Sequence, residues 1–249
     1  YKKLLNKKTK IVAITHTSNT MGTINPIKEL IKYAHQAGAI FLVDAAQSVA
    51  HTKVDVQSLN CDFLVFSAHK IYGPTGIGIM YGKEDLLNSM PPYRGGGNMI
   101  ERVSIESSTY NELPHKFEAG TPHIAGGIAF KDAINYIKDI GIDNIESYEE
   151  ELRKYATEQL QQINNLKIIG TSKKKSSILS FDIKGVHPHD LGTLLDRQGI
   201  AVRTGHHCTQ PLMKRYNLTA TTRASFSFYN TKEEIDLLVA GIKKSLTML

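Results

Sequence analysis

The chain has little cysteine and no tryptophan. Its two cysteines, Cys61 and Cys208, are the only ones in 249 residues, and they form no CxxC pair. A disulfide framework is therefore excluded, and a reducing compartment, the cytoplasm, is expected. No apolar run reaches the roughly 18 residues that span a membrane, and the start of the chain lacks the apolar core of a signal peptide. We expect no membrane association.

Positive charge is only slightly in excess of negative charge. The net charge is +6 and the pI is about 9.1, which would suit a nucleic-acid partner. The lysines, however, are scattered in pairs with one triplet, 173–175, and no aromatic residues alternate with them as they do in single-strand binders. We expect no nucleic-acid partner and interpret the triplet as a solvated turn. The 41% hydrophobic content supports a substantial core.

The first half of the chain alternates between strand and helix patterns. Short apolar runs predict strands at 10–15, 39–43, 63–66 and 78–81, and helical spacing predicts a helix at 26–37. This alternation is typical of a doubly wound, mostly parallel α/β sheet. Residues 82–115 are expected to be irregular, because they contain paired prolines and a glycine run.

The second half predicts a small α+β domain. Helices are expected at 125–140 and 144–164, with a change of domain between residues 138 and 145. Strands at 166–169, 177–182, 200–202 and 223–228, and helices at 187–198 and 231–246, complete the domain. Thr231 and Glu234 form a predicted capping box at the last helix.

Reactive side chains follow three predicted strands of the first half. Asn19, Asp44 and the group Ser67, His69 and Lys70 each come after a strand. Ligands in α/β sheets bind at the carboxyl ends of the strands, so these residues are candidates for one site. Lys70 could bind a phosphate or form a Schiff base, or it could be a solvated loop lysine. Asp44 could pair with a cationic ring nitrogen or cap a helix.

The stretches from Asp44 to Gln47 and from Ser67 to Gly78 resemble the class V aminotransferase group of fold type I pyridoxal-phosphate enzymes. The resemblance implies that Lys70 forms a Schiff base with pyridoxal phosphate and that Asp44 holds the pyridinium nitrogen. It also implies that Gln47 contacts the cofactor's phenolic oxygen and that Asn19 lies near that oxygen or the substrate. Ser67 and His69 would contact the cofactor's phosphate. Cys61 is expected to pack as a small hydrophobe.

A second cluster runs from Arg203 to Pro211 and contains His206, His207 and Cys208. Three interpretations are open. The cluster could bind zinc with help from histidines 187 and 189, although the usual second ligand pair is absent. Cys208 could pack passively in a loop. It could also be a nucleophilic thiolate whose pKa is lowered by Arg203, His206 and His207.

The Arg-Thr-Gly-His-His-Cys stretch resembles cysteine desulfurases of the SufS type. The resemblance implies that L-cysteine is converted to L-alanine, that Cys208 carries the resulting persulfide, and that the sulfur serves iron–sulfur cluster assembly. Arg223, helped by Arg203, would bind the substrate carboxylate. Thr121, in an Ala-Gly-Thr-Pro stretch, would reach the cofactor phosphate of a partner subunit, which implies a homodimer. A SufE- or SufU-type protein would accept the sulfur.

The same resemblance implies the domain limits and leaves several alternative functions open. Residues 1–140 would be the C-terminal part of the large cofactor-binding domain, and 141–249 the small domain with the nucleophilic cysteine. The family's large domain begins before the counterpart of Tyr1, so part of the cofactor pocket is expected to lie outside this sequence. A selenocysteine lyase, an aminotransferase, a kynureninase-like hydrolase and an inactive fragment are the alternatives.

Overall fold

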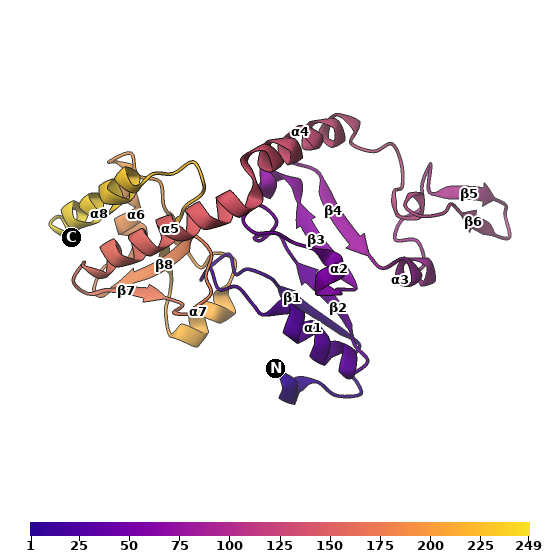
Figure 1. The fold of residues 1–249 in the computed structure, drawn as a ribbon, viewed down its shortest axis with the longest axis horizontal. Coiled ribbons are helices and arrows are strands. Elements are labelled where there is room, and N and C mark those ends of the chain that lie inside the picture. Colours follow the sequence, from indigo (N-terminus) through magenta and orange to yellow (C-terminus); the bar gives the residue numbers. More distant parts are fainter. The chain divides into compact units, whose positions relative to one another are not determined.

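The computed structural model describes all residues from 1 to 249 (Figure 1). It divides into two compact units, each described here by itself. The first comprises residues 1–14, 27–50 and 54–139, and the second comprises 15–26, 51–53 and 140–249. Two short segments from the early part of the chain therefore belong to the second unit. None of the helices combines the length and the apolar character that a membrane span requires.

The first unit contains a four-stranded sheet of order β1-β2-β3-β4. Its strands are β1 (Ile11–Thr15), β2 (Ile40–Asp44), β3 (Phe63–Ser67) and β4 (Gly78–Gly82). Strands β2 and β3 are parallel, which confirms the predicted α/β class, whereas β4 pairs antiparallel with β3. The connection between β3 and β4 is too short for the crossover of a dozen or more residues that a parallel strand requires.

Helix α1 (Ile27–Gln36) covers strand β2 and closes the core of this sheet. The helix forms because Ile27, Ile31 and Ala34 recur at helical spacing, and all three are buried. They pack with Phe41 of β2 and with Cys61, both 0% exposed, which confirms that Cys61 is a core residue. Burial of each large apolar side chain contributes about 1.5–3 kcal/mol.

Part of the stretch predicted to be irregular is ordered, so that prediction was wrong for α3 (Glu84–Ser89) and for the hairpin of β5 (Ile100–Val103) and β6 (Ser108–Tyr110). The hairpin residues are almost all exposed, and no apolar periodicity therefore marks them in the sequence. Helix α4 (Ile124–Ile140) follows as predicted. The remaining elements of the unit are η1 (Lys2–Leu4), α2 (Val56–Leu59), η2 (Ala68–Ile71) and η3 (His115–Phe117).

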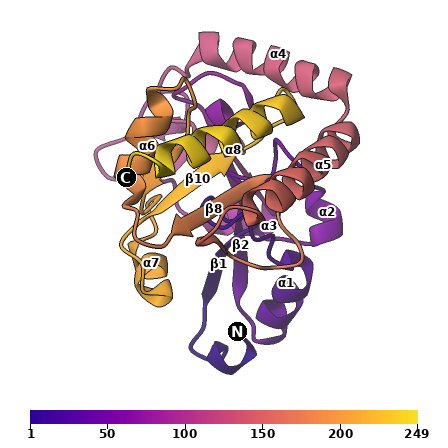
Figure 2. The same cartoon turned by 90° about the vertical axis from the view of Figure 1, so that its left-hand side faces the viewer.

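The second unit is an antiparallel sheet packed against helices. Its elements are β7 (Leu166–Ile169), β8 (Ile178–Ile183), β9 (Arg203–Gly205), β10 (Thr221–Ser225), α5 (Ile142–Gln161), α6 (Pro188–Asp196), α7 (Gln210–Tyr216) and α8 (Lys232–Leu246). The sheet order is β7-β8-β10-β9, and Figure 2 shows α5 and α8 in front of β8 and β10. Residues from α5, α6, α8, β8 and β10 share one apolar core.

Sequence patterns misplaced two strands of this unit. The strand predicted at 200–202 lies at Arg203–Gly205, because Ile200 and Val202 pack on the core but the Ile200 amide donates to the Leu195 carbonyl at the end of α6. The strand predicted at 223–228 ends at Ser225. Helix α7 was not predicted. The capping box of α8 is confirmed.

Candidate functional site

Lys70 lies on a tight turn that follows strand β3. Residues Ala68–Ile71 form a single 3₁₀ turn, and Tyr72 closes it in a left-handed conformation with φ 61°. The turn is fixed by a hydrogen bond of 2.9 Å from the Gly73 amide to the Ala68 carbonyl. A Cβ on Gly73 would lie 2.6 Å from Cδ2 of Phe130 in α4, so only glycine fits here. His69 and Lys70 are both exposed on this rigid support.

Asp44 and the Lys70 turn follow neighbouring parallel strands. In the sheet register Asp44 lies opposite Val65, two residues before Ser67 ends β3. Asp44 is exposed, and its Oδ1 accepts a hydrogen bond of 2.9 Å from the Ala46 amide. Gln47, three residues later, is half-buried. The carboxyl ends of β2 and β3 therefore present a carboxylate and an amine at one edge of the sheet.

Thr121 is also exposed and lies in the loop before α4. The preceding residue, Gly120, has φ +85°, a left-handed value that favours glycine, and its amide donates to the Gly97 carbonyl at 2.8 Å. A turn built in this way presents the Thr121 hydroxyl to solvent.

The second unit carries Cys208 on the loop between β9 and α7. Cys208 is exposed, and it follows the buried His207. Both residues have left-handed backbones, with φ 52° for His207 and 62° for Cys208. The loop places a free thiol at the surface on a constrained backbone.

Arg203 and Arg223 form a pair of cations next to this loop. They lie directly opposite one another on β9 and β10, so their side chains leave the same face of the sheet. Burial and then the Arg203 charge lower the pKa of Arg223. Arg223 Nη1 donates to the Asn19 carbonyl at 2.7 Å, whereas its buried Nε has no hydrogen-bond partner. An anionic ligand such as a carboxylate would offset the repulsion between the two arginines and would accept a hydrogen bond from the unpaired Nε of Arg223.

His207 does not act as the cation that was expected to stabilise a Cys208 thiolate. Burial, and then the charges of Arg223 and Arg203, lower the pKa of His207 to about 4, against the opposing effect of a hydrogen bond with Thr221. The imidazole is therefore neutral at pH 7 and contributes no positive charge beside the thiol. His206, in contrast, is exposed, as is Arg203.

Asn19 contacts the cysteine loop rather than standing alone at a strand end. Its side-chain amide donates to the His207 carbonyl at 2.9 Å, across 188 residues of sequence. Next to it, Thr20 shares a hydrogen bond of 2.9 Å with Thr209. Sequence reasoning missed Thr20, Thr209 and Thr221, because hydroxyl contacts between distant segments leave no local pattern. No group of three or more His, Cys, Asp or Glu side chains is arranged to hold a metal ion.

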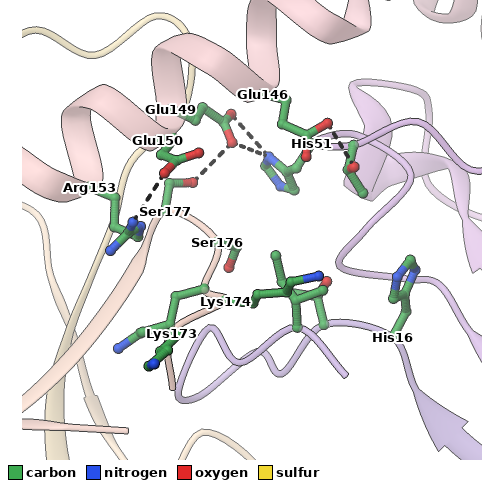
Figure 3. Close-up of a pocket in the computed structure, with 14 residues that line it drawn as sticks. His16, His51, Glu146, Glu149, Glu150, Arg153, Lys173, Lys174, Ser176 and Ser177 are labelled. Atoms are coloured by element: carbon green, nitrogen blue, oxygen red, sulfur yellow. Dashed lines mark hydrogen bonds and ion pairs between the residues drawn. The ribbon is translucent and has the colours of Figure 1, made fainter. Parts of the chain in front are cut away.

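A polar cavity of about 340 Å³ lies elsewhere in the second unit, and Figure 3 shows its lining. At its wall the buried Glu149 accepts hydrogen bonds from His51 Nδ1 at 2.8 and 3.0 Å, from Ser177 at 3.0 Å and from Ser227 at 2.9 Å. This carboxylate ties the segment 51–53 to α5 and to the segment that leads into β8.

The lysine triplet borders the same cavity and is only partly solvated. Lys173 and Lys174 are exposed, as predicted, but Lys175 is half-buried and donates to the Gly170 carbonyl at 2.6 Å. Burial and then the Arg153 charge lower the pKa of Lys175 to about 8. The turn interpretation was therefore wrong for Lys175.

Comparison with known proteins assigns the family. The aminotransferase class-V family model matches residues 1–238. A probable cysteine desulfurase of Halalkalibacterium halodurans is 54% identical over 243 residues, which are 98% of this chain and 60% of the relative. A cysteine desulfurase of Escherichia coli strain K12 is 50% identical over 242 residues, or 97% of this chain and 59% of the relative.

Solved structures agree with the sequence comparison. A crystal structure of an Escherichia coli cysteine desulfurase aligns with TM-score 0.95 and 41% identity, covering 99% of this chain and 61% of that one. The apo cysteine desulfurase of Thermococcus onnurineus aligns with the same score and identity, covering 100% and 62%. The chain thus spans about 60% of the length of these relatives and has their fold, that of fold type I enzymes. It belongs to the aminotransferase class-V family.

Proposed function

We propose that the protein is a pyridoxal-phosphate-dependent cysteine desulfurase that converts L-cysteine to L-alanine and leaves a persulfide on Cys208. The observation that carries the proposal is the exposed Cys208 thiol on the constrained loop that follows β9, the strand on which Arg203 faces Arg223 of β10. A thiol and a carboxylate-binding pair in one place suit an amino-acid substrate that donates sulfur. Relatives at about 50% identity that are named cysteine desulfurases support it.

The residues at the edge of the first unit's sheet fit pyridoxal phosphate. Lys70 offers an exposed primary amine, and Asp44 offers a carboxylate at the end of the neighbouring strand that would pair with the pyridinium nitrogen. The cofactor would supply an electron sink for the substrate's α-carbon. Ser67 and His69 would contact its phosphate, and Gln47 its phenolic oxygen. Asn19 would contribute near that oxygen or the substrate.

Proton transfer, substrate binding and nucleophilic attack would be carried out by different residues of the chain. The Lys70 amine would move the substrate's α-proton, and Arg223 with Arg203 would hold the substrate carboxylate. The Cys208 thiolate would attack the substrate sulfur, so that a Sγ–S bond forms as the Cβ–S bond of the substrate breaks. The electron pair of the broken bond passes to the carbon skeleton, which takes up a proton and leaves as alanine.

Finer features of the proposal follow the family resemblance. The protein would act in the cytoplasm as a homodimer in which Thr121 reaches the cofactor phosphate of the other subunit. Residues 1–140 would form part of the cofactor-binding domain, and 141–249 the small domain with Cys208. A SufE- or SufU-type protein would take the persulfide sulfur into iron–sulfur cluster assembly.

The test compares two variants of the full-length protein loaded with pyridoxal phosphate. Lys70→Ala should lose the protein-bound absorption band that borohydride fixes, together with alanine formation. Cys208→Ala should keep that band and lose alanine and sulfide production. Sustained sulfide release by Cys208→Ala would reject the mechanism, and a borohydride-fixed band in Lys70→Ala would reject the cofactor assignment.

A further inference from the structure

Two consecutive residues of the cysteine loop occupy an unfavourable backbone conformation. His207 and Cys208 have φ 52° and 62°, and neither is a glycine or an asparagine. The left-handed region costs an L-residue about 1–2 kcal/mol, so two in succession persist only where surrounding contacts hold them. The contacts that hold this loop therefore determine where the Cys208 thiol lies.

The main contact runs through the His207 ring. His207 is 4% exposed, and its Nε2 lies 2.9 Å from Oγ1 of Thr221, which is itself 0% exposed on β10. Thr221 lies two residues before Arg223 on the same strand, so the two side chains share one face of the sheet. The ring thus anchors the loop to the strand that carries the proposed substrate-binding arginine.

The ring makes this contact as a neutral group. A protonated imidazole donates from both nitrogens, but the buried Nδ1 of His207 has no hydrogen-bond partner. Burial, and then the nearby cations Arg223 and Arg203, disfavour a positive ring and lower the pKa of His207 to about 4. A neutral, buried ring is suited to holding a backbone in place and is poorly suited to transferring a proton near pH 7.

Three further hydrogen bonds hold the loop. The Asn19 amide donates to the His207 carbonyl, and Thr209 Oγ1 donates to the His206 carbonyl at 2.7 Å. Since the Thr209 hydroxyl proton is used in this way, Thr20 is the donor in the hydroxyl pair between Thr20 and Thr209. His207 and Thr209 flank the cysteine and both use their side chains, but of the two only the His207 ring bonds to strand β10.

We propose that His207 is a positioning residue and that its hydrogen bond with Thr221 holds the Cys208 thiol in place for attack on the substrate sulfur. The inference rests on the proposed function only in taking Cys208 as the nucleophile. It predicts that the hydrogen bond, rather than a proton on the ring, is what the reaction requires.

The experiment uses the full-length, cofactor-loaded protein and four variants. Thr221→Val removes the hydroxyl at constant shape, and Thr221→Ser restores it. His207→Gln keeps a donor near the position of Nε2 but cannot titrate. Thr219→Val is the matched control, because Thr219 is exposed and precedes Thr221 by two residues. The measurements are kcat and KM for alanine formation from L-cysteine, and amide hydrogen exchange of residues 206–209.

Thr221→Val should reduce kcat about tenfold, the effect expected for one buried hydrogen bond, with KM changed by less than about twofold. It should also accelerate exchange in 206–209 by about tenfold. Thr221→Ser, His207→Gln and Thr219→Val should each stay close to the unaltered protein. Loss of activity in His207→Gln with slow exchange retained would instead identify proton transfer by the ring and overturn the proposal.

The two readouts separate this proposal from the proposed function. If the unaltered protein forms no alanine from L-cysteine, the proposed function fails, and hydrogen exchange alone still decides whether Thr221 anchors the loop. Unchanged exchange in Thr221→Val overturns the anchoring role. Faster exchange with unchanged kcat shows that the anchored geometry is not needed for the reaction, which also overturns the proposal.

Discussion

Replacement of Glu149 by alanine should destabilise the second unit severely. Its side chain is 4% exposed and accepts hydrogen bonds from three donors, His51, Ser177 and Ser227. The substitution leaves these donors without an acceptor, and each unsatisfied buried group costs about 1–3 kcal/mol. Partial relaxation and access of water through the adjoining cavity reduce the sum, so we expect a loss of about 4 kcal/mol in the free energy of opening.

Native-state hydrogen exchange of peptides from α5 and β8 measures this loss in the full-length protein without assuming one cooperative transition. A loss of about 4 kcal/mol accelerates exchange by roughly a thousandfold. Glu158→Ala is the matched control, because Glu158 is an exposed residue of the same helix and should change the free energy by less than about 0.5 kcal/mol. Equal effects of Glu149→Ala and Glu158→Ala would refute the buried-network account.

Three further substitutions test other parts of the structure. Gly73→Ala should cost about 1–3 kcal/mol through its clash with Phe130, whereas Gly95→Ala, with open space around it, should be near neutral in thermal unfolding. Burial raises the pKa of Asp62, but hydrogen bonds from Lys83, the Phe41 amide and His35 outweigh burial and lower the pKa below its usual value of 3.8. The stability that this lowered pKa provides is therefore lost as the pH falls through the folded-state value. Asp62→Asn should weaken the loss of stability at acid pH, as measured by equilibrium unfolding. Because the pKa of His207 is lowered to about 4 in the folded protein, the imidazole takes up a proton more readily in the unfolded chain. Stability therefore falls as the pH drops from 6.5 toward about 4. His207→Gln should weaken this pH dependence in hydrogen-exchange measurements of residues 206–209.

Much of the fold could be predicted because burial leaves a period in the sequence. The spacing of Ile27, Ile31 and Ala34 marks α1, and the apolar run 40–43 marks β2, since both bury one continuous face. The β5–β6 hairpin and α7 bury almost nothing, so no period reveals them. The predicted position of β9 was wrong because Ile200 and Val202 pack against the core although they lie outside any strand.

The sequence indicates the reactive residues of the candidate site, but it does not indicate the tertiary contacts that hold them. Lys70 and Cys208 stand in short, dense motifs, where residue type and spacing already indicate chemistry. The bond between His207 and Thr221 and the contacts of Asn19 and Thr20 arise only when distant segments meet. The charge state of His207 likewise depends on tertiary burial, so the sequence suggested a cation where the structure has a neutral ring.

The most direct test of the central claim is the mass of the Cys208 peptide after the full-length, cofactor-loaded protein reacts with L-cysteine without a reductant. The account predicts the addition of one sulfur atom on Cys208, one alanine formed for each sulfur added, and loss of both in Cys208→Ser. Sulfur on another residue, or undiminished alanine formation by Cys208→Ser, would contradict it.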